Sequence, residues 1–158
     1  MGRTTEKTII KFKLVEGATF PEPSRAKPGD AGFDIVSVGA VHCPAKQVTV
    51  VDTPFIVADA PDLLPDGSDY YIKVNSRSGM AAKHGLFPIT GTIDKGYRGQ
   101  IKVVMYNAGA LDVQLNPGDR IAQLVVHKIA ANDLEFEITD NITPTERGDS
   151  GFGSSGRQ

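Results

Sequence analysis

The sequence has little of what several classes of protein require. It contains one cysteine, Cys43, which excludes an internal disulfide framework and indicates a reducing compartment such as the cytoplasm. Its 17 lysines and arginines are scattered and its formal net charge is -2, so it lacks the basic stripe that a nucleic-acid duplex requires. Apolar runs such as 101–105 and 121–126 are too short to cross a membrane, and residues 1–7 lack the apolar core of a secretory signal. We therefore expect a cytoplasmic protein that binds neither nucleic acid nor a membrane.

Short strand-like segments make up most of the chain, and helical periodicity is almost absent. In residues 8–15 the apolar side chains Ile10, Phe12 and Leu14 alternate with lysines, which is the two-residue period of a half-buried strand. Further strands are predicted, between Gly- and Pro-containing turns, over 47–51, 70–74, 99–106, 111–115 and 121–129. One short helix is predicted over 79–84. For a chain of 158 residues this pattern indicates a single all-β domain, a jelly-roll-like β-barrel.

Residues 143–158 have a different composition from the rest of the chain. They are rich in glycine and serine, contain Arg147 near their start, and have one aromatic residue, Phe152. Composition alone predicts a mobile C-terminal arm. Such an arm could become ordered over a phosphorylated ligand, with its backbone amides facing oxygens and its ring on a flat group.

Five segments carry residues suited to phosphate and nucleotide chemistry. In chain order they are 26–34 (AKPGDAGFD), 75–81 (NSRSGMA), 91–99 (GTIDKGYRG), 117–124 (PGDRIAQL) and 147–156 (RGDSGFGSSG). The second joins a strand to a helix start, where Arg, Ser and free amides suit a phosphate. The third predicts a β-hairpin with an acid and an aromatic residue at its turn, and the fourth predicts a turn that runs into a buried strand.

In this order and spacing, the five segments resemble the five motifs of the trimeric dUTPase family, from about residue 26 to residue 156. The resemblance implies one dUTPase domain over 1–158, whose arm, 143–158, closes over the active site. It also implies Mg²⁺-assisted hydrolysis of dUTP to dUMP and pyrophosphate, by attack of water on the α-phosphate, in a homotrimer with shared active sites. Such an enzyme keeps uracil out of DNA and supplies dUMP for thymidylate synthesis. The chain departs from the family pattern at Pro88, where many relatives have asparagine, and at Ser76, where proline is commoner.

The third segment is implied to hold the nucleoside and the catalytic base. Asp94 corresponds to the family's general base, and a carboxylate suits this role because it is ionised at neutral pH. Judged without the other motifs, Asp94 would more often be a turn-capping residue. Tyr97 is implied to pack against the deoxyribose and to leave no room for a 2′-hydroxyl. Uracil is implied to bind main-chain groups of Thr92, Ile93 and Asp94, and of Lys102.

The remaining segments are implied to bind the phosphates and the metal. The residues that correspond to phosphate contacts are Arg77, Ser78, Gly79 and Gln123. Asp34 corresponds to an outer-shell anchor that holds a water of Mg²⁺, which agrees with the reluctance of this ion to lose water. Asp119 is expected to pair with Arg77. In the arm, Arg147 is implied to approach the γ-phosphate and Phe152 to stack on uracil, while the terminal phosphate is wrapped by Gly153, Ser154 and Ser155.

Two other functions remain open at this stage. A dCTP deaminase has a similar fold and is one alternative. Deaminases of this kind have Arg-Ser-Ser in the second segment and a glutamate as base, whereas this chain has Gly79 after Arg-Ser and Asp94 in the third segment. A catalytically idle binding protein of the same fold is the other alternative, and loss of Asp94 or of the arm motif would have favoured it. The histidines, His42, His84 and His127, stand alone in the sequence without a second ligand at metal spacing.

Overall fold

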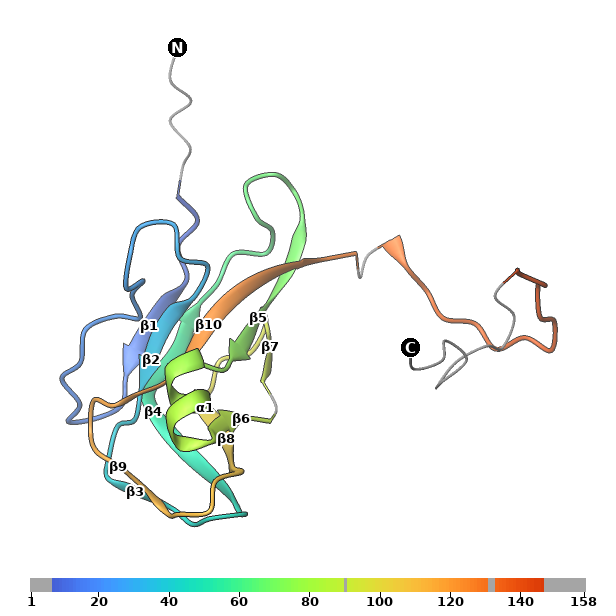
Figure 1. Ribbon diagram of the computed structural model, residues 1–158. Helices are drawn as coiled ribbons and strands as arrows, with labels where there is room; N and C mark the ends of the chain where they lie inside the picture. Colours follow the sequence, from blue (N-terminus) through green and yellow to red (C-terminus); the bar gives the residue numbers. More distant parts are fainter. Residues whose placement is uncertain (1–6, 90, 131–132, 147–158) are drawn as a thin grey trace.

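The computed structural model describes residues 7–89, 91–130 and 133–146, which form two four-stranded antiparallel sheets, a two-stranded sheet and one short helix (Figure 1). The strands are β1 (Lys11–Leu14), β2 (Phe33–Val36), β3 (Val41–Cys43), β4 (Val48–Asp59), β5 (Asp69–Asn75), β6 (Leu86–Pro88), β7 (Thr92–Asp94), β8 (Gln100–Asn107), β9 (Val113–Leu115) and β10 (Arg120–Ile129). One sheet has the order β1-β4-β8-β6, the other β2-β10-β5-β7, and β3 pairs with β9. The prediction of an all-β jelly-roll fold is confirmed, although the described strands form open sheets and not a closed barrel.

Alternation of side chains along the strands builds the core. Tyr70, Ile72 and Val74 of β5 are buried, and their neighbours along the strand are more exposed. β8 follows the same period, and its buried face includes Ile101. The inner faces of the two sheets therefore share one apolar core, in which Phe12 packs on Phe55 with ring centroids 5.7 Å apart. The predicted alternation in residues 8–15 is confirmed, since Ile10 is half-buried like Phe12, but the paired strand is shorter than predicted.

The helix α1 (Ser78–His84) lies between β5 and β6 and agrees with the prediction over 79–84. Its first turn has no side-chain cap, because Arg77 at the N-cap position makes no capping hydrogen bond. It ends at Gly85, whose φ of 64° is the left-handed conformation that favours glycine. In the described ranges no helix has the length and apolarity that a membrane span needs.

The predicted hairpin over 91–99 is wrong. β7 pairs with β5 in one sheet, whereas β8 pairs with β4 and β6 in the other, so the connection 95–99 crosses between layers. The physical reason is burial: Ile93 pairs with Ile72 on one inner face, and Ile101 belongs to the inner face of the other sheet. β7 is consequently the edge strand of its sheet in the described part of the chain.

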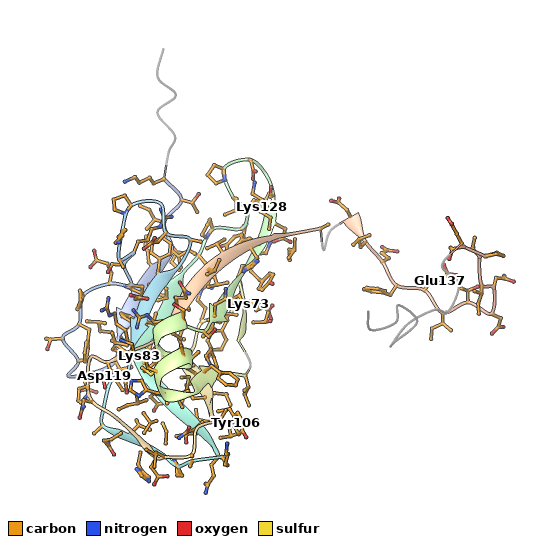
Figure 2. The ribbon with its side chains drawn as sticks, in the orientation of Figure 1. Lys73, Lys83, Tyr106, Asp119, Lys128 and Glu137 are labelled. Atoms are coloured by element: carbon orange, nitrogen blue, oxygen red, sulfur yellow. The ribbon has the colours of Figure 1, made fainter. Side chains whose placement is uncertain are left out.

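Beyond β10 the described segment 133–146 extends away from the body (Figure 1). Leu134, Phe136 and Ile138 alternate with glutamates along it, and Phe136 and Ile138 are completely exposed. Figure 2 shows the side chains of this segment, Glu137 among them, clear of the side chains of the body. An alternating apolar row of this kind is the pattern of a strand that buries one face, and here that face is uncovered.

Candidate active site

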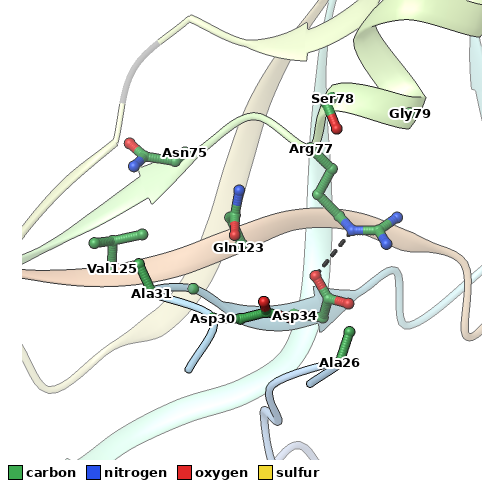
Figure 3. Close-up of a pocket in the computed structure, with 11 residues that line it drawn as sticks. Ala26, Asp30, Ala31, Asp34, Asn75, Arg77, Ser78, Gly79, Gln123 and Val125 are labelled. Carbon is green, nitrogen blue, oxygen red and sulfur yellow. Dashed lines mark hydrogen bonds and ion pairs between the residues drawn. The ribbon is translucent and has the colours of Figure 1, made fainter. Parts of the chain in front are cut away.

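The first of two hollows, the Arg77 hollow, forms where β2, β5 and β10 meet the start of α1 (Figure 3). Its volume is about 400 Å³. It is lined by Ala26, Asp30, Ala31, Gly32, Asp34, Asn75, Arg77, Ser78, Gly79, Gln123 and Val125. The structure thus brings together the predicted phosphate-binding and metal-anchoring residues of the first, second and fourth segments, because β10 pairs with both β2 and β5.

Arg77 is held at the wall of this hollow by a charge-assisted hydrogen bond. Its Nε donates to Oδ1 of Asp34 at 2.8 Å (Figure 3). Its Nη1 donates to the carbonyl oxygen of Arg120 at 3.2 Å. The second carboxylate oxygen of Asp34 lies 3.4 Å from Nη1 of Arg120. Asp34 is only 15% exposed, so the pair is partly shielded from solvent and orients the guanidinium at the hollow.

The prediction that Asp119 pairs with Arg77 is wrong. The carboxylate of Asp119 instead accepts the backbone N–H of Asn116 at 2.8 Å and closes the turn before β10. The same turn has a backbone bond from Asp119 to the carbonyl oxygen of Asn116 and a left-handed Gly118. Asp is favoured in such turns because its carboxylate can accept a backbone N–H of the same turn. The Asp119 carboxylate is used in this way, and Asp34 of β2 is the partner of Arg77.

Gln123 reaches the hollow because residue 32 is glycine. The Nε2 of Gln123 donates to the carbonyl oxygen of Ser76 at 2.9 Å, which places its amide beside the second segment. A Cβ at Gly32 would lie 1.9 Å from Oε1 of Gln123 and would displace this side chain. The glycine just before β2 therefore has a steric function in this hollow, since it leaves room for the Gln123 side chain.

The second hollow, the Tyr97 hollow, lies at the free edge of β7 and has a volume of about 320 Å³. It is lined by Val74, Gly91, Thr92, Ile93, Asp94, Tyr97, Gln100, Ile101 and Lys102. An edge strand offers unpaired N–H and C=O groups, and a flat heterocycle with a hydrogen-bonding edge can use these. The described residues predicted for the nucleoside therefore line one hollow, although its strands belong to different sheets. Phe152, which is predicted to stack on uracil, lies outside the described residues.

Tyr97 lies on the connection that follows β7, and the residue is 44% exposed. Its N–H donates to the carbonyl oxygen of Asp94 at 2.9 Å, and its hydroxyl donates to the carbonyl oxygen of Gln100 at 2.8 Å. A Cβ at Gly99 would lie 2.3 Å from the Tyr97 hydroxyl oxygen, so this ring position requires glycine there. The ring is thus fixed at its polar end and has surface available for a ligand.

Asp94 ends β7 with an exposed side chain, opposite Tyr71 of β5. Lys102 directs its ammonium group to Oδ1 of Asp52 at 3.2 Å, which leaves its main chain as the part suited to recognition. The Arg77 and Tyr97 hollows share no lining residue. The predicted arm residues, Arg147, Phe152, Gly153, Ser154 and Ser155, lie outside the described residues.

Other chemical centres are weak candidates. Burial raises the pKa of the Cys43 thiol, which keeps the sulfur protonated and unreactive at neutral pH. His42 lies 3.2 Å from Asp112 on the surface, and His127 stacks on Tyr71. Within the described ranges no three His, Cys, Asp or Glu side chains are grouped as a metal cage.

Comparison with known proteins assigns the family. The family model described as dUTPase matches residues 18–156 of the chain. The chain belongs to the dUTPase family. It is 41% identical over 146 residues to the deoxyuridine 5′-triphosphate nucleotidohydrolase of Zymomonas mobilis, with 91% of this chain and 94% of that protein covered.

Solved dUTPases share the fold. The Staphylococcus bacteriophage 80alpha dUTPase with dUPNHPP superposes with a TM-score of 0.77 at 28% identity, covering 96% of this chain and 100% of that one. A mutant dUTPase from phage phi11 of S. aureus has a TM-score of 0.63 at 26% identity, with 90% of this chain and 99% of that chain covered. That structure is described as revealing the coordination of a structural Mg(II) ion.

Sequence reasoning missed several contacts that shape the dUTPase site. Arg120 beside Asp34 follows from the pairing of β10 with β2, which sets these residues on neighbouring strands. Lys95 lies in the third segment without a predicted role, yet it forms an ion pair with the buried Asp69. The signal that could have indicated this pair is a lysine inside a motif turn together with an aspartate at the end of another loop.

Proposed function

We propose that this chain hydrolyses dUTP to dUMP and pyrophosphate, with the nucleoside in the Tyr97 hollow and the phosphates in an Arg77 hollow. The proposal rests chiefly on the placement of Asp94 and Tyr97 together at the open edge of β7. There a carboxylate, an exposed aromatic residue and the main chain of a described edge strand meet. Membership of the dUTPase family supports the same substrate.

Asp94 acts in this proposal on the attacking water. Its exposed carboxylate accepts a proton from the water as the oxygen approaches the α-phosphorus, which gives a better nucleophile at neutral pH. Binding of the uracil edge by the main chain of β7 and Lys102 fixes the α-phosphate relative to Asp94. Tyr97 packs on the deoxyribose, so that a 2′-hydroxyl meets its ring and UTP is rejected.

The Arg77 hollow binds the phosphate chain. Arg77 is already oriented by Asp34, and Ser78 and Gly79 present the uncapped first turn of α1. Positive charge and amides near the bridging oxygen stabilise the negative charge that develops on the departing pyrophosphate. Gln123, held beside Ser76, adds an amide that can donate to the α- and β-phosphate oxygens.

The residues present fit Mg²⁺ bound mainly by the triphosphate. Asp34 places one carboxylate in the Arg77 hollow, which suits a water-mediated contact better than an all-protein cage. Asp34 also accepts a hydrogen bond from Arg77, so the same carboxylate would hold both the ion, through water, and the phosphate-binding cation. When bound, the ion neutralises phosphate charge and stabilises the leaving pyrophosphate.

The active site is proposed to form between chains of a homotrimer. The two hollows of one chain have no lining residue in common, so a nucleotide can occupy the Tyr97 hollow of one chain and the Arg77 hollow of another. The exposed apolar side chains Leu134, Phe136 and Ile138 of the segment 133–146 give a physical reason for association with a second chain. Location in the cytoplasm stays part of this proposal and is supported by the free, buried thiol of Cys43.

Pyrophosphate release tests the proposed function. We expect rapid release from dUTP, little from dTTP, dCTP or UTP, and loss of most activity when EDTA removes Mg²⁺. The four nucleotides are compared at equal concentration with a coupled pyrophosphate assay, and ammonia is measured in parallel. Ammonia from dCTP without pyrophosphate from dUTP would instead identify a deaminase.

Removal of residues 147–158 tests whether the C-terminal arm, 143–158, closes over the active site. The shortened protein is expected to keep the mass of a trimer in sedimentation and its thermal transition, because the described core lies before residue 147. Its kcat/KM for dUTP is expected to fall about ten- to hundredfold, the equivalent of one lost base-stacking contact. A Phe152→Leu variant separates loss of stacking from loss of the whole segment. Unchanged turnover in the shortened protein would refute a role for the arm.

A further inference from the structure

The catalytic strand β7 is short, and the segment that follows it needs its own support. β7 pairs through three residues with β5 and, among the described strands, has no partner on its other side. Asp94 is its last residue, and Tyr97 lies three residues later on the connection 95–99, which crosses to the other sheet. The positions of both side chains therefore depend on contacts that the connection makes with the rest of the chain.

Lys95 joins this connection to the loop between β4 and β5. Its Nζ lies 2.8 Å from Oδ1 of Asp69 and donates to the carbonyl oxygen of Asp62, also at 2.8 Å. The Asp69 side chain is 9% exposed and that of Lys95 34%, so the ion pair is largely shielded from water. A shielded pair with a second hydrogen bond restrains its partners much more than an exposed pair does.

The partner of Lys95 is itself rigidly placed. Oδ1 of Asp69 also accepts the N–H of Tyr70 at 2.8 Å, and the Tyr70 hydroxyl donates to the carbonyl oxygen of Pro61 at 2.7 Å. Tyr70 is 1% exposed, and burial raises its pKa while the positive charge of Lys95 lowers it. Lys95 is thus tied to a part of the loop that is anchored in the core.

The other end of the connection is also held. Gly99 accepts the N–H of Val57 on β4 at 3.1 Å, and Nη1 of Arg98 donates to the carbonyl oxygen of Lys95 at 2.8 Å. The connection is therefore fixed to β4 at its end and to the β4–β5 loop at its start. Loss of the Lys95 contact would release the start, next to Asp94, and leave the end in place.

We propose that Lys95 is a positioning residue, which through Asp69 holds the Asp94 carboxylate and the Tyr97 ring in place for dUTP hydrolysis. The inference rests on the proposed roles of Asp94 and Tyr97. It adds that turnover and rejection of the 2′-hydroxyl both depend on an ion pair outside the two hollows. Lys95 acts on the reaction only through its neighbours in the chain and lines neither hollow.

The test compares kcat and KM for dUTP and UTP in four single variants. Lys95→Met and Asp69→Asn are expected to lower kcat for dUTP about ten- to hundredfold, since small displacements of reacting groups cost that much. The ratio of kcat/KM for dUTP to that for UTP is expected to fall about tenfold as Tyr97 loses its fixed position. Lys95→Arg, which keeps the charge, is expected to restore most of both quantities. Lys128→Met is the matched control, because Lys128 bonds Asp66 of the same loop but lies on the exposed surface.

A merely structural role gives a different result. Lower thermal stability of Lys95→Met with unchanged kcat and unchanged UTP rejection overturns the inference, as does an equal loss of kcat in Lys128→Met. The double variant Lys95→Met, Asp69→Asn is expected to be no slower than the slower single variant, and fully additive losses contradict the coupling. Failure of the wild-type chain to release pyrophosphate from dUTP would refute the proposed function itself. The Lys95 inference fails separately, when the wild-type chain is active and the variants match it.

Discussion

Replacement of Asp94 by asparagine is expected to lower kcat for dUTP about 100- to 10,000-fold, the range that general-base catalysis contributes. Asparagine has nearly the same shape as aspartate but does not take a proton from water at neutral pH. Nucleotide binding is expected to persist, because the main chain of β7 and the ring of Tyr97 are unchanged. Full activity of Asp94→Asn would rule out this residue as the base.

The fold is expected to tolerate this substitution. The Asp94 side chain is exposed at the end of an edge strand, and exposed substitutions usually change the free energy of unfolding by about 0.5 kcal/mol or less. Thermal unfolding checks this point, and calorimetric titration with a non-hydrolysable dUTP analogue checks binding. The control is Asp59→Asn, which removes a carboxylate paired with Lys11 on the surface and is expected to leave kcat unchanged.

Replacement of Arg77 by leucine is expected to lower kcat/KM for dUTP about 100- to 1,000-fold, as removal of one preorganised donor to a developing anion does. Arg77 already has its orientation before substrate binds, because Nε is bonded to Asp34 at 2.8 Å. The leucine variant loses the cation and also leaves Asp34 with the weaker contact to Arg120 at 3.4 Å. The uncompensated carboxylate would then repel phosphate, which adds to the loss.

Lysine at position 77 separates charge from geometry. Arg77→Lys keeps the positive charge but cannot donate to Asp34 and to the Arg120 carbonyl oxygen with one planar group, so an intermediate kcat/KM is expected. Steady-state rates of pyrophosphate release measure both variants. The control is Arg25→Leu, whose guanidinium lies 4.6 Å from the centre of the Phe33 ring and outside the Arg77 hollow. An equal loss in Arg25→Leu would show a general effect of charge.

Strands with a buried face were the most predictable elements. β5, β8 and β10 lie within one or two residues of their predicted ranges, because their alternating side chains pack on one core. β4 extends to Asp59, far beyond the predicted end at residue 51. Pro54 lies inside this strand, where a register shift between Asp52 and Ile56 accommodates it, and β1 pairs with the second half.

Short strands were missed for a related reason. β3 and β6 have three residues each, which is too few to show a period, and β6 ends with Pro88. Each gains its backbone partners from a strand distant in sequence, β9 for β3 and β8 for β6. Such pairing has no local signature in the chain.

The sequence by itself determined the alternating core, the short helix and the segments that carry Arg77, Asp94 and Gln123, because these depend on residue type and local spacing. Only the tertiary structure decided which groups meet. It placed β7 and β8 in different sheets and paired Arg77 with Asp34 and not with Asp119. It also brought Lys95 into contact with Asp69. The physical reason is that a side chain's partner depends on strand pairing and on competing local hydrogen bonds. Both are fixed only when the whole core packs.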